Sequence, residues 1–259
     1  MNLNKNEPRI LLFDIETAPN VSYTWGKYDQ NVIEFKQEWY IMSFAYKWLD
    51  EDKVVCHALP EYKSYKKDRE DDKELVKELH KLFNEADMVI AHNGDEFDIK
   101  KANARFIYHG LNPPAPYKTV DTKKIAKNNF KFNSNSLTDL GQHLGLGEKL
   151  PTGGFSLWKG CMSGDKKSWD TMIKYNKQDV KLLEQVYLKL RPWHKTHPNL
   201  GHFAEEKHSC PKCGSTHLQS RGLSKTLSSI YRRFQCQGCG AWSRAAQSEK
   251  GTRVKVTNL

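Results

Sequence analysis

The sequence lacks the long hydrophobic runs of a membrane protein, because no stretch approaches the roughly 18 apolar residues that a spanning helix needs. The opening residues, M-N-L-N-K-N-E-P, contain no apolar stretch of the kind found in a secretory signal peptide. The chain also has no internal repeat at a fixed period and no low-complexity tract. We therefore expect an intracellular, cytoplasmic protein without a membrane partner, encoded by a bacterium or by a phage within its host.

Acidic residues are almost absent from the last fifth of the chain. Residues 208–259 contain nine lysines and arginines but only one acid, Glu249, and so carry +8 of the total net charge of +10. A local positive excess attracts a polyanion, and aromatic residues between the arginines can stack on bases. This segment is therefore predicted to bind nucleic acid, with docking to a protein as the alternative. The candidate contact residues are Arg221, Lys225, Tyr231, Arg232, Arg233, Trp242 and Arg244.

Cysteine is scarce, but four of the six cysteines form two C-x-x-C pairs in this basic segment. These four are Cys210, Cys213, Cys236 and Cys239. Two such pairs can close one tetrahedral site, and Gly214 and Gly240 permit the left-handed turn that follows each pair. Disulfides would need an oxidising compartment, which nothing in the sequence indicates. We predict one structural Zn²⁺, with Cys56 and Cys161 as free thiols.

Hydrophobic patterning predicts an α/β fold. Apolar runs predict strands over residues 9–15, 40–48, 53–58, 88–91 and 117–120. Helical spacing, with capping and stop signals, predicts helices over residues 72–84, 98–108, 136–145 and 169–190. Asp121 is expected to cap a further helix rather than to bind a metal. The order implies a mixed sheet with helices on its faces. We expect a domain over residues 1–190, a linker over 191–207 and a zinc module over 208–259.

The first of three acidic motifs is Phe13-Asp14-Ile15-Glu16-Thr17, at the end of an apolar strand. Alternation along a strand sends the side chains of Asp14 and Glu16 to one face. Two carboxylates on one face repel each other unless a cation lies between them, and hard oxygen ligands suit Mg²⁺ or Mn²⁺. The alternative is a solvated strand end.

Two further motifs follow along the chain. In His92-Asn93-Gly94-Asp95-Glu96-Phe97-Asp98, Asp95 is the expected helix N-cap, which leaves Asp98 free to reach a metal. Asn93 is expected to position this motif or to contact a substrate. On the last long helix, Tyr175 and Asp179 lie at i and i+4 and so share one helix face. The alternative is a core tyrosine beside a surface aspartate.

Taken in order, F-D-I-E-T, H-N-G-D-E-F-D and Y-N-K-Q-D resemble the three motifs of the DEDD superfamily of 3′–5′ exonucleases. The tyrosine in the third motif is typical of the DEDDy subtype, which is similar to the proofreading domains of DNA polymerases. The resemblance covers about residues 9–190. It implies a ribonuclease-H-like fold, with a central five-stranded mixed sheet flanked by helices, and leaves the zinc module outside the family core.

The resemblance also implies the chemistry of the site. Two Mg²⁺ or Mn²⁺ ions, roughly 3.5–4 Å apart, would clamp the scissile phosphate. Asp14 would bridge both ions. Glu16 and Asp179 would hold the ion beside the attacking water, and Asp98 would support the second ion. Tyr175 would orient the water, because a phenol with an ordinary pKa near 10 is a poor base.

The leading interpretation is a free-standing, metal-dependent 3′–5′ exonuclease that acts on nucleic-acid ends, with single-stranded DNA favoured over RNA. A polymerase or another replication or repair protein is a candidate partner in trans. One alternative is a 3′–5′ exoribonuclease that processes RNA, because the choice depends on contacts to the 2′-hydroxyl group. The other alternative is a non-catalytic adaptor that keeps the fold and binds nucleic acid.

Overall fold

The computed structural model describes residues 7–28, 30–204 and 208–254. The chain divides into two compact units, of which one comprises Arg9–Val186 and the other contains the chain from Tyr187 onward. None of the helices in these described ranges is long and apolar enough to cross a bilayer.

The first unit is built on a mixed sheet of five strands in the order β5-β4-β1-β6-β7. The strands are β1 (Ile10–Thr17), β4 (Ile41–Trp48), β5 (Val55–Ala58), β6 (Met88–Ala91) and β7 (Lys118–Asp121). Strand β1 pairs with β4 antiparallel and with β6 parallel; β5 continues the antiparallel side and β7 the parallel side. This arrangement confirms the predicted five-stranded mixed sheet with flanking helices.

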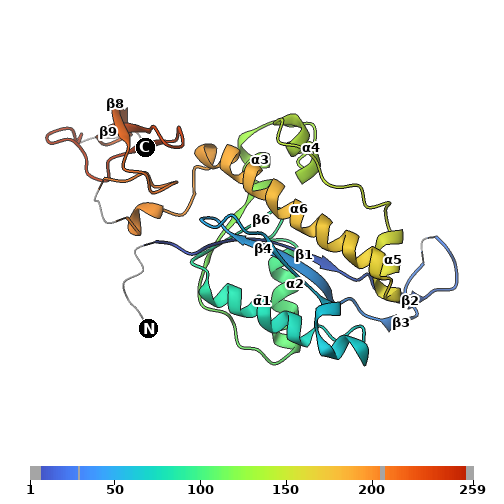
Figure 1. Cartoon of the computed structure of the whole chain (residues 1–259). Coiled ribbons are helices and arrows are strands. Elements are labelled where there is room, and N and C mark those ends of the chain that lie inside the picture. The colour runs from blue at the N-terminus through green and yellow to red at the C-terminus, as the bar shows by residue number, and fades with distance from the viewer. Residues whose placement is uncertain (1–6, 29, 205–207, 255–259) are drawn as a thin grey trace. The chain divides into compact units, whose positions relative to one another are not determined.

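Helices cover both faces of this sheet (Figure 1). Helices α1 (Lys73–Glu85) and α2 (Asp98–Tyr108) lie on one face, and α6 (Lys166–Leu190) lies on the other. On the first face Phe13 of β1 meets Phe83 of α1 edge to face, with 5.0 Å between the ring centroids. On the second face Ser43 of β4 donates a hydrogen bond to Asn176 of α6 at 3.1 Å. Burial on both sides explains why β1 begins as a continuous apolar run.

Helix α6 begins earlier than the apolar pattern predicts. The prediction placed its start at Trp169, whereas the helix starts at Lys166. Asp165 caps the first turn, because its carboxylate accepts hydrogen bonds from the backbone N–H and the hydroxyl of Ser168, at 2.9 and 2.6 Å. Further along, Lys47 of β4 forms a 2.5 Å ion pair with Glu184 and ties the helix to the sheet.

Several short elements complete the first unit. A separate hairpin of β2 (Val21–Tyr23) and β3 (Glu34–Gln37) follows β1, and the sequence pattern did not predict it. Helices α3 (Thr122–Asn129), α4 (Leu137–His143) and α5 (Ser156–Ser163) precede α6. Ser136 caps α4 as predicted, by accepting the N–H of Asp139 at 3.1 Å. Asp121 caps α3, also as predicted. The 3₁₀ helices in the described ranges are Leu59–Glu61, Lys63–Lys66, Arg191–Trp193 and Leu200–His202.

The second unit contains a three-stranded antiparallel sheet in the order β10-β9-β8. Its strands are β8 (Leu218–Lys225), β9 (Ile230–Cys236) and β10 (Trp242–Arg244). The segment predicted as a linker folds with this unit, since Leu200 N–H donates to Pro211 O at 2.8 Å and the Lys212 ammonium donates to Pro192 O. In the described part of this unit, a small hydrophobic cluster of buried residues surrounds the cysteines, with Cys210, Cys236 and Ala241 at its centre.

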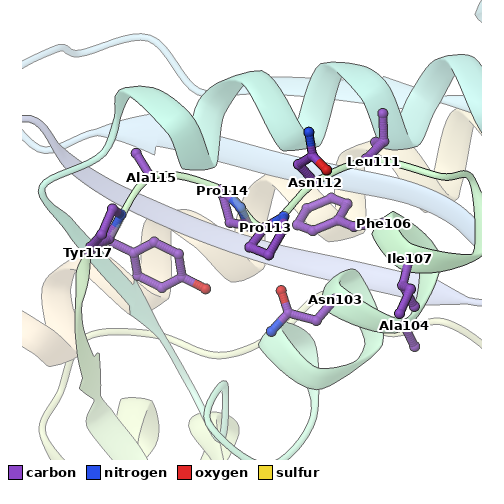
Figure 2. A pocket seen from close by; sticks show the side chains of 11 residues that line it. Asn103, Ala104, Phe106, Ile107, Leu111, Asn112, Pro113, Pro114, Ala115 and Tyr117 are labelled. Carbon is purple, nitrogen blue, oxygen red and sulfur yellow. The ribbon is translucent and has the colours of Figure 1, made fainter.

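An apolar pocket of about 640 Å³ lies between α2 and the proline-rich segment 111–117. Figure 2 shows Phe106, Pro113 and Tyr117 around it. Its lining contains no acid and none of the residues predicted to bind a metal. The pocket is therefore separate from the chemistry that the acidic motifs predict.

Candidate active site

Strand β1 and helix α6 bring three predicted acids together. Asp14 and Glu16 project from one face of β1, while Phe13 and Ile15 fill the core on the other face. Asp179 of α6 meets this face, and single carboxylate oxygens of Asp14, Glu16 and Asp179 all lie within 4.8 Å of one another. The result is a tight group of three carboxylates that two different elements hold in place.

A buried asparagine fixes Asp14. The Asn176 side-chain NH₂ donates to Asp14 Oδ2 at 2.7 Å and to Asp14 O at 3.3 Å. Its amide oxygen accepts the hydroxyl of Ser43 on the neighbouring strand at 3.1 Å. Sequence reasoning gave Asn176 no role, although it lies inside the third motif. The available signal was its position beside Tyr175, three residues before Asp179 on the same helix.

Asp98 lies next to this group, at the start of α2. Its Oδ1 accepts the backbone N–H of Ile15 at 3.2 Å, between the two acids of β1. Asp98 is outside the tightest set of three carboxylates, but its charge raises the pKa of Asp14.

The predicted role of Asp95 as the N-cap of α2 is wrong, because Phe97 occupies the N-cap position without a side-chain cap. Asp95 instead accepts the Lys124 ammonium at 2.9 Å.

A lysine that sequence reasoning missed enters the site. Lys149, in the loop between α4 and α5, places its ammonium 2.5 Å from Asp179 Oδ2 and 3.0 Å from the hydroxyl of Tyr175. Burial disfavours its charged form, but the Asp179 and Asp14 carboxylates outweigh burial and raise the pKa of Lys149. The loop has no periodic pattern, so no sequence signal pointed to this residue. Tyr175 and Asp179 share one helix face, as predicted from their spacing.

The acids are strongly destabilised as anions. Burial, followed by repulsion from Asp98, Glu16 and Asp179, raises the pKa of Asp14 far above its usual range. Burial and the charge of Asp179 raise the pKa of Glu16 to about 8. Burial raises the pKa of Asp98 to about 7 and also raises that of Asp179. At neutral pH the group therefore favours either protons or a cation with more than one charge.

The donor set fits a hard divalent cation. Carboxylate oxygens are the ligands that Mg²⁺ and Mn²⁺ prefer. Asp179 Oδ1 is buried and has no hydrogen-bond partner in the described part of the chain. Such an orphaned acceptor is costly unless a ligand satisfies it. The residues that would hold the cation are Asp14, Glu16 and Asp179, with Asp98 beside them.

The turn between β6 and α2, which leads into Asp98, has an unusual backbone conformation. Asn93 has a positive φ of 66°, a rare conformation for a residue other than glycine that asparagine adopts more readily than most. Asp121 holds it there by accepting the Asn93 N–H at 3.0 Å. His92 of the same motif is structural, since its ring bonds the Thr122 hydroxyl at 2.8 Å and Asn135 O at 3.0 Å. Asn93 thus shapes the second motif through its backbone.

The four-cysteine cluster of the second unit fits zinc. All four Sγ atoms lie within 4.8 Å of one another, with Cys210 to Cys239 at 3.7 Å and Cys213 to Cys236 at 3.6 Å. A tetrahedron with Zn–S bonds of about 2.3 Å has edges of about 3.8 Å. The sulfurs are too far apart for disulfides, and all six cysteines are free.

Glycines shape the two turns of the cysteine cluster. Gly214 and Gly240 have φ values of 73° and 77°. Each therefore adopts the left-handed conformation that was predicted after its cysteine pair.

One face of the three-stranded sheet carries two arginine–aromatic pairs. The Arg233 guanidinium lies 4.7 Å from the Trp242 ring centroid, and that of Arg244 lies 4.1 Å from the Tyr231 ring centroid. Arg232 alternates to the opposite face, where it pairs with Glu249 at 3.0 Å. The structure thus brings four of the predicted nucleic-acid contacts together and separates Arg232 from them. Exposed Arg221 and Lys225 lie on β8.

Comparisons with known proteins agree with this fold. Residues 35–191, more than half of the chain, match the RNase H superfamily, so the chain belongs to that superfamily. The match begins after β1 and includes Asp98, Tyr175 and Asp179. No curated protein matches the sequence.

Solved structures with the same fold include the family B DNA polymerase from the hyperthermophilic archaeon Pyrobaculum calidifontis. The two chains are 17% identical, with a TM-score of 0.50, over 71% of this chain and 25% of the polymerase chain. This chain thus spans about a quarter of the polymerase's length. Family and fold together support a nuclease.

In EDTA, the protein is expected to lose stability as the pH rises from about 4 to about 8. The raised pKa values mean that the folded acids hold protons that the unfolded chain has already released, so ionisation works against folding. Mg²⁺ or Mn²⁺ should therefore raise Tm more at about pH 8 than at about pH 5. Thermal melts by circular dichroism measure both effects. Glu16→Gln should show a weaker pH dependence, and equal metal shifts at both pH values would contradict the prediction.

Lys149→Met should destabilise the metal-free protein by roughly 1–3 kcal/mol near neutral pH, because Asp179 loses its ion partner in a buried position. We place the loss below that of a fully buried pair because the Lys149 side chain is 29% exposed. Lys166→Met is the matched control, since it removes an exposed pair with Asp170 and should cost at most about 0.5 kcal/mol. Urea unfolding in EDTA compares the two variants. Equal losses would show that Lys149 does not neutralise the acids.

Proposed function

We propose that the chain is a metal-dependent 3′–5′ exonuclease of the DEDDy type that acts on nucleic-acid ends, with single-stranded DNA favoured over RNA. The observation that carries the proposal is the group of Asp14, Glu16 and Asp179, whose oxygens lie within 4.8 Å of one another beside Asp98 and Tyr175. These are the five residues that the three sequence motifs contribute. Membership of the RNase H superfamily supports a nuclease.

The acids would hold two divalent cations, which when bound neutralise phosphate charge and lower the pKa of water. Asn176 keeps the Asp14 carboxylate in place through a 2.7 Å hydrogen bond. Asp98 is fixed by the Ile15 N–H. The site therefore does not have to rearrange as charge develops on the phosphate, which is the main condition for electrostatic catalysis.

Tyr175 is suited to orient water rather than to remove a proton. Burial and the nearby Asp179 charge raise the pKa of its hydroxyl, so it stays protonated. Trp158 packs edge to face against its ring, with 6.3 Å between centroids. The Lys149 ammonium, 3.0 Å away, brings a positive charge to the same place, where it can attract a phosphate.

The basic module would hold the nucleic acid. We assign catalysis to the domain of residues 1–190 and nucleic-acid binding to the zinc module of residues 208–259, which carries +8 of the net charge. Stacked arginine and aromatic side chains on β9 and β10 offer both phosphate and base contacts. The alternative of a non-catalytic adaptor does not account for buried acids whose mutual repulsion costs stability without a cation.

The first test is the direction of digestion. With Mg²⁺ or Mn²⁺, oligonucleotides labelled at the 3′ end should lose the label at once as mononucleotide, whereas 5′-labelled ones should shorten stepwise. EDTA should stop the reaction. Asp14→Asn keeps the shape of the side chain but removes its charge, so we expect a loss of roughly 10³-fold. Asp170→Asn, which changes an exposed acid on the same helix as Asp179, is the control.

Digestion from the 5′ end, or an Asp14→Asn variant as fast as Asp170→Asn, would contradict the proposal. Matched DNA and RNA oligonucleotides decide between a deoxyribonuclease and the exoribonuclease alternative. Binding without cleavage of either would favour the adaptor.

The second test concerns the arginine–aromatic face. Combining Arg233→Gln with Arg244→Gln should flatten the plot of log affinity against log salt by about 1.4 on single strands, if each arginine contacts one phosphate. Arg232→Gln is the matched control, because Arg232 lies on the opposite face and is paired with Glu249. Fluorescence anisotropy over a salt series measures the slopes. If the plot of the double variant is as steep as that of the wild type, this face does not hold the backbone, and protein docking becomes its better explanation.

A further inference from the structure

The hairpin that follows β1 exposes aromatic side chains. Trp25 is 91% exposed, Tyr28 73% and Tyr23 56%, and Ile33 and Phe35 are about half exposed. Isolated exposed apolar residues are ordinary, but five within one short hairpin form a patch, and such patches mark binding surfaces. Folding of the first unit does not use these side chains.

The hairpin is anchored at its base. Ala18 N–H donates to Tyr40 O at 2.9 Å, and Trp39 N–H donates to the Asn20 side chain at 2.9 Å. Within the hairpin, Ile33 N–H donates to Tyr23 O at 3.0 Å. The side chain of Thr24 donates locally too, to Gly26 O. Tyr23 and Phe35 thus lie on an anchored pair of strands, and Trp25, Tyr28 and Ile33 lie between those strands along the chain.

We propose that this hairpin, residues 21–28 and 30–37, holds the single-stranded part of the substrate by base stacking, upstream of the bond that is cut. The inference rests on the proposed exonuclease function. Strand β1 carries Asp14 and Glu16 and leads directly into the hairpin, so the base of the hairpin lies next to these acids along the chain. Glu16 and Trp25 are nine residues apart, at most about 32 Å of chain, or about nine nucleotides at a rise of about 3.4 Å.

The chemistry of the hairpin favours bases over phosphates. Lys27 and Lys36 are balanced by Asp29 and Glu34, so residues 21–37 carry no net charge. An uncharged aromatic surface can stack on any base but offers little grip on the backbone. Its contribution should therefore be independent of sequence and nearly independent of salt. The hairpin should differ in this respect from the basic zinc module, whose affinity for nucleic acid should fall as the salt concentration rises.

A second exposed aromatic belongs to another segment of the first unit. Phe155, at the N-cap position of α5, is 55% exposed. One helical turn later, Trp158 contacts the ring of Tyr175 in the acid site. Exposed aromatic side chains are therefore available on two segments that connect to the acid site, and each can stack on a base of a flexible single strand.

Binding of an oligothymidylate of about 16 nucleotides, longer than the reach of the hairpin, tests the proposal. Fluorescence anisotropy with the full chain, in an Asp14→Asn background and without chelator, avoids cleavage and leaves the metal of the cysteine cluster in place. Trp25→Ala and Tyr28→Ala should each raise Kd by about 10-fold, the scale of one lost base–aromatic stack. The loss should be the same at low and high salt. Tyr108→Ala removes a matched tyrosine, 69% exposed at the end of α2, and should leave Kd unchanged.

A small substrate separates this inference from the proposed function. The p-nitrophenyl ester of thymidine 5′-monophosphate reaches only the acids, so its hydrolysis should be the same in the hairpin variants and the wild type. Absence of ester hydrolysis by the wild type would contradict the exonuclease proposal. The oligonucleotide-binding data would still decide whether the hairpin binds single strands. Slower ester hydrolysis in Trp25→Ala and Tyr28→Ala would show that the hairpin supports the acid site instead.

Wild-type affinity in Trp25→Ala and Tyr28→Ala would overturn the inference. So would a wild-type oligomer that these variants convert to monomers without any change in oligonucleotide affinity, as measured by light scattering. In that case the patch is a contact between copies of the chain.

Discussion

Repulsion between crowded carboxylates is the constraint on which the first unit depends. Asp14, Glu16 and Asp179 lie within 4.8 Å of one another, with Asp179 buried and Asp14 and Glu16 half-buried. Two groups limit the cost: Asn176 donates to Asp14, and the Lys149 ammonium lies against Asp179. One lysine charge does not balance three carboxylates, so the arrangement persists because the surrounding core holds it. That core is why β1 is lined with apolar residues before the acids begin.

Secondary-structure geometry explains which parts of this site the sequence could predict. Alternation along β1 placed Asp14 and Glu16 on one face, and the i, i+4 spacing on α6 aligned Tyr175 with Asp179. Both rules act within a single element, so no tertiary information was needed. Lys149 could not be found in this way, because its loop has no periodicity and its role depends on a contact 30 residues away.

The errors have equally local causes. Asp95 has the residue type of an N-cap, but the positive φ of Asn93 turns the chain so that α2 begins later, and Asp95 pairs with Lys124. Helix α6 was predicted to start at its first apolar residue, Trp169, whereas Asp165 caps a helix that starts three residues earlier, at Lys166. The hairpin of β2 and β3 escaped prediction because its aromatic residues are exposed and so show no core-facing alternation.

In both units, folding brings together side chains that suit a metal ion. In the second unit, Cys210, Cys236 and Ala241 form a core too small to stabilise a sheet, while four sulfurs converge as the carboxylates do in the first. In each unit, folding gathers ligand atoms that repel each other once ionised, and a cation would remove that repulsion. The ligand types differ, with oxygen suited to a hard exchangeable ion and sulfur to a firmly held one. A chain with both sets can therefore keep a permanent structural metal while its other site depends on the ions in solution.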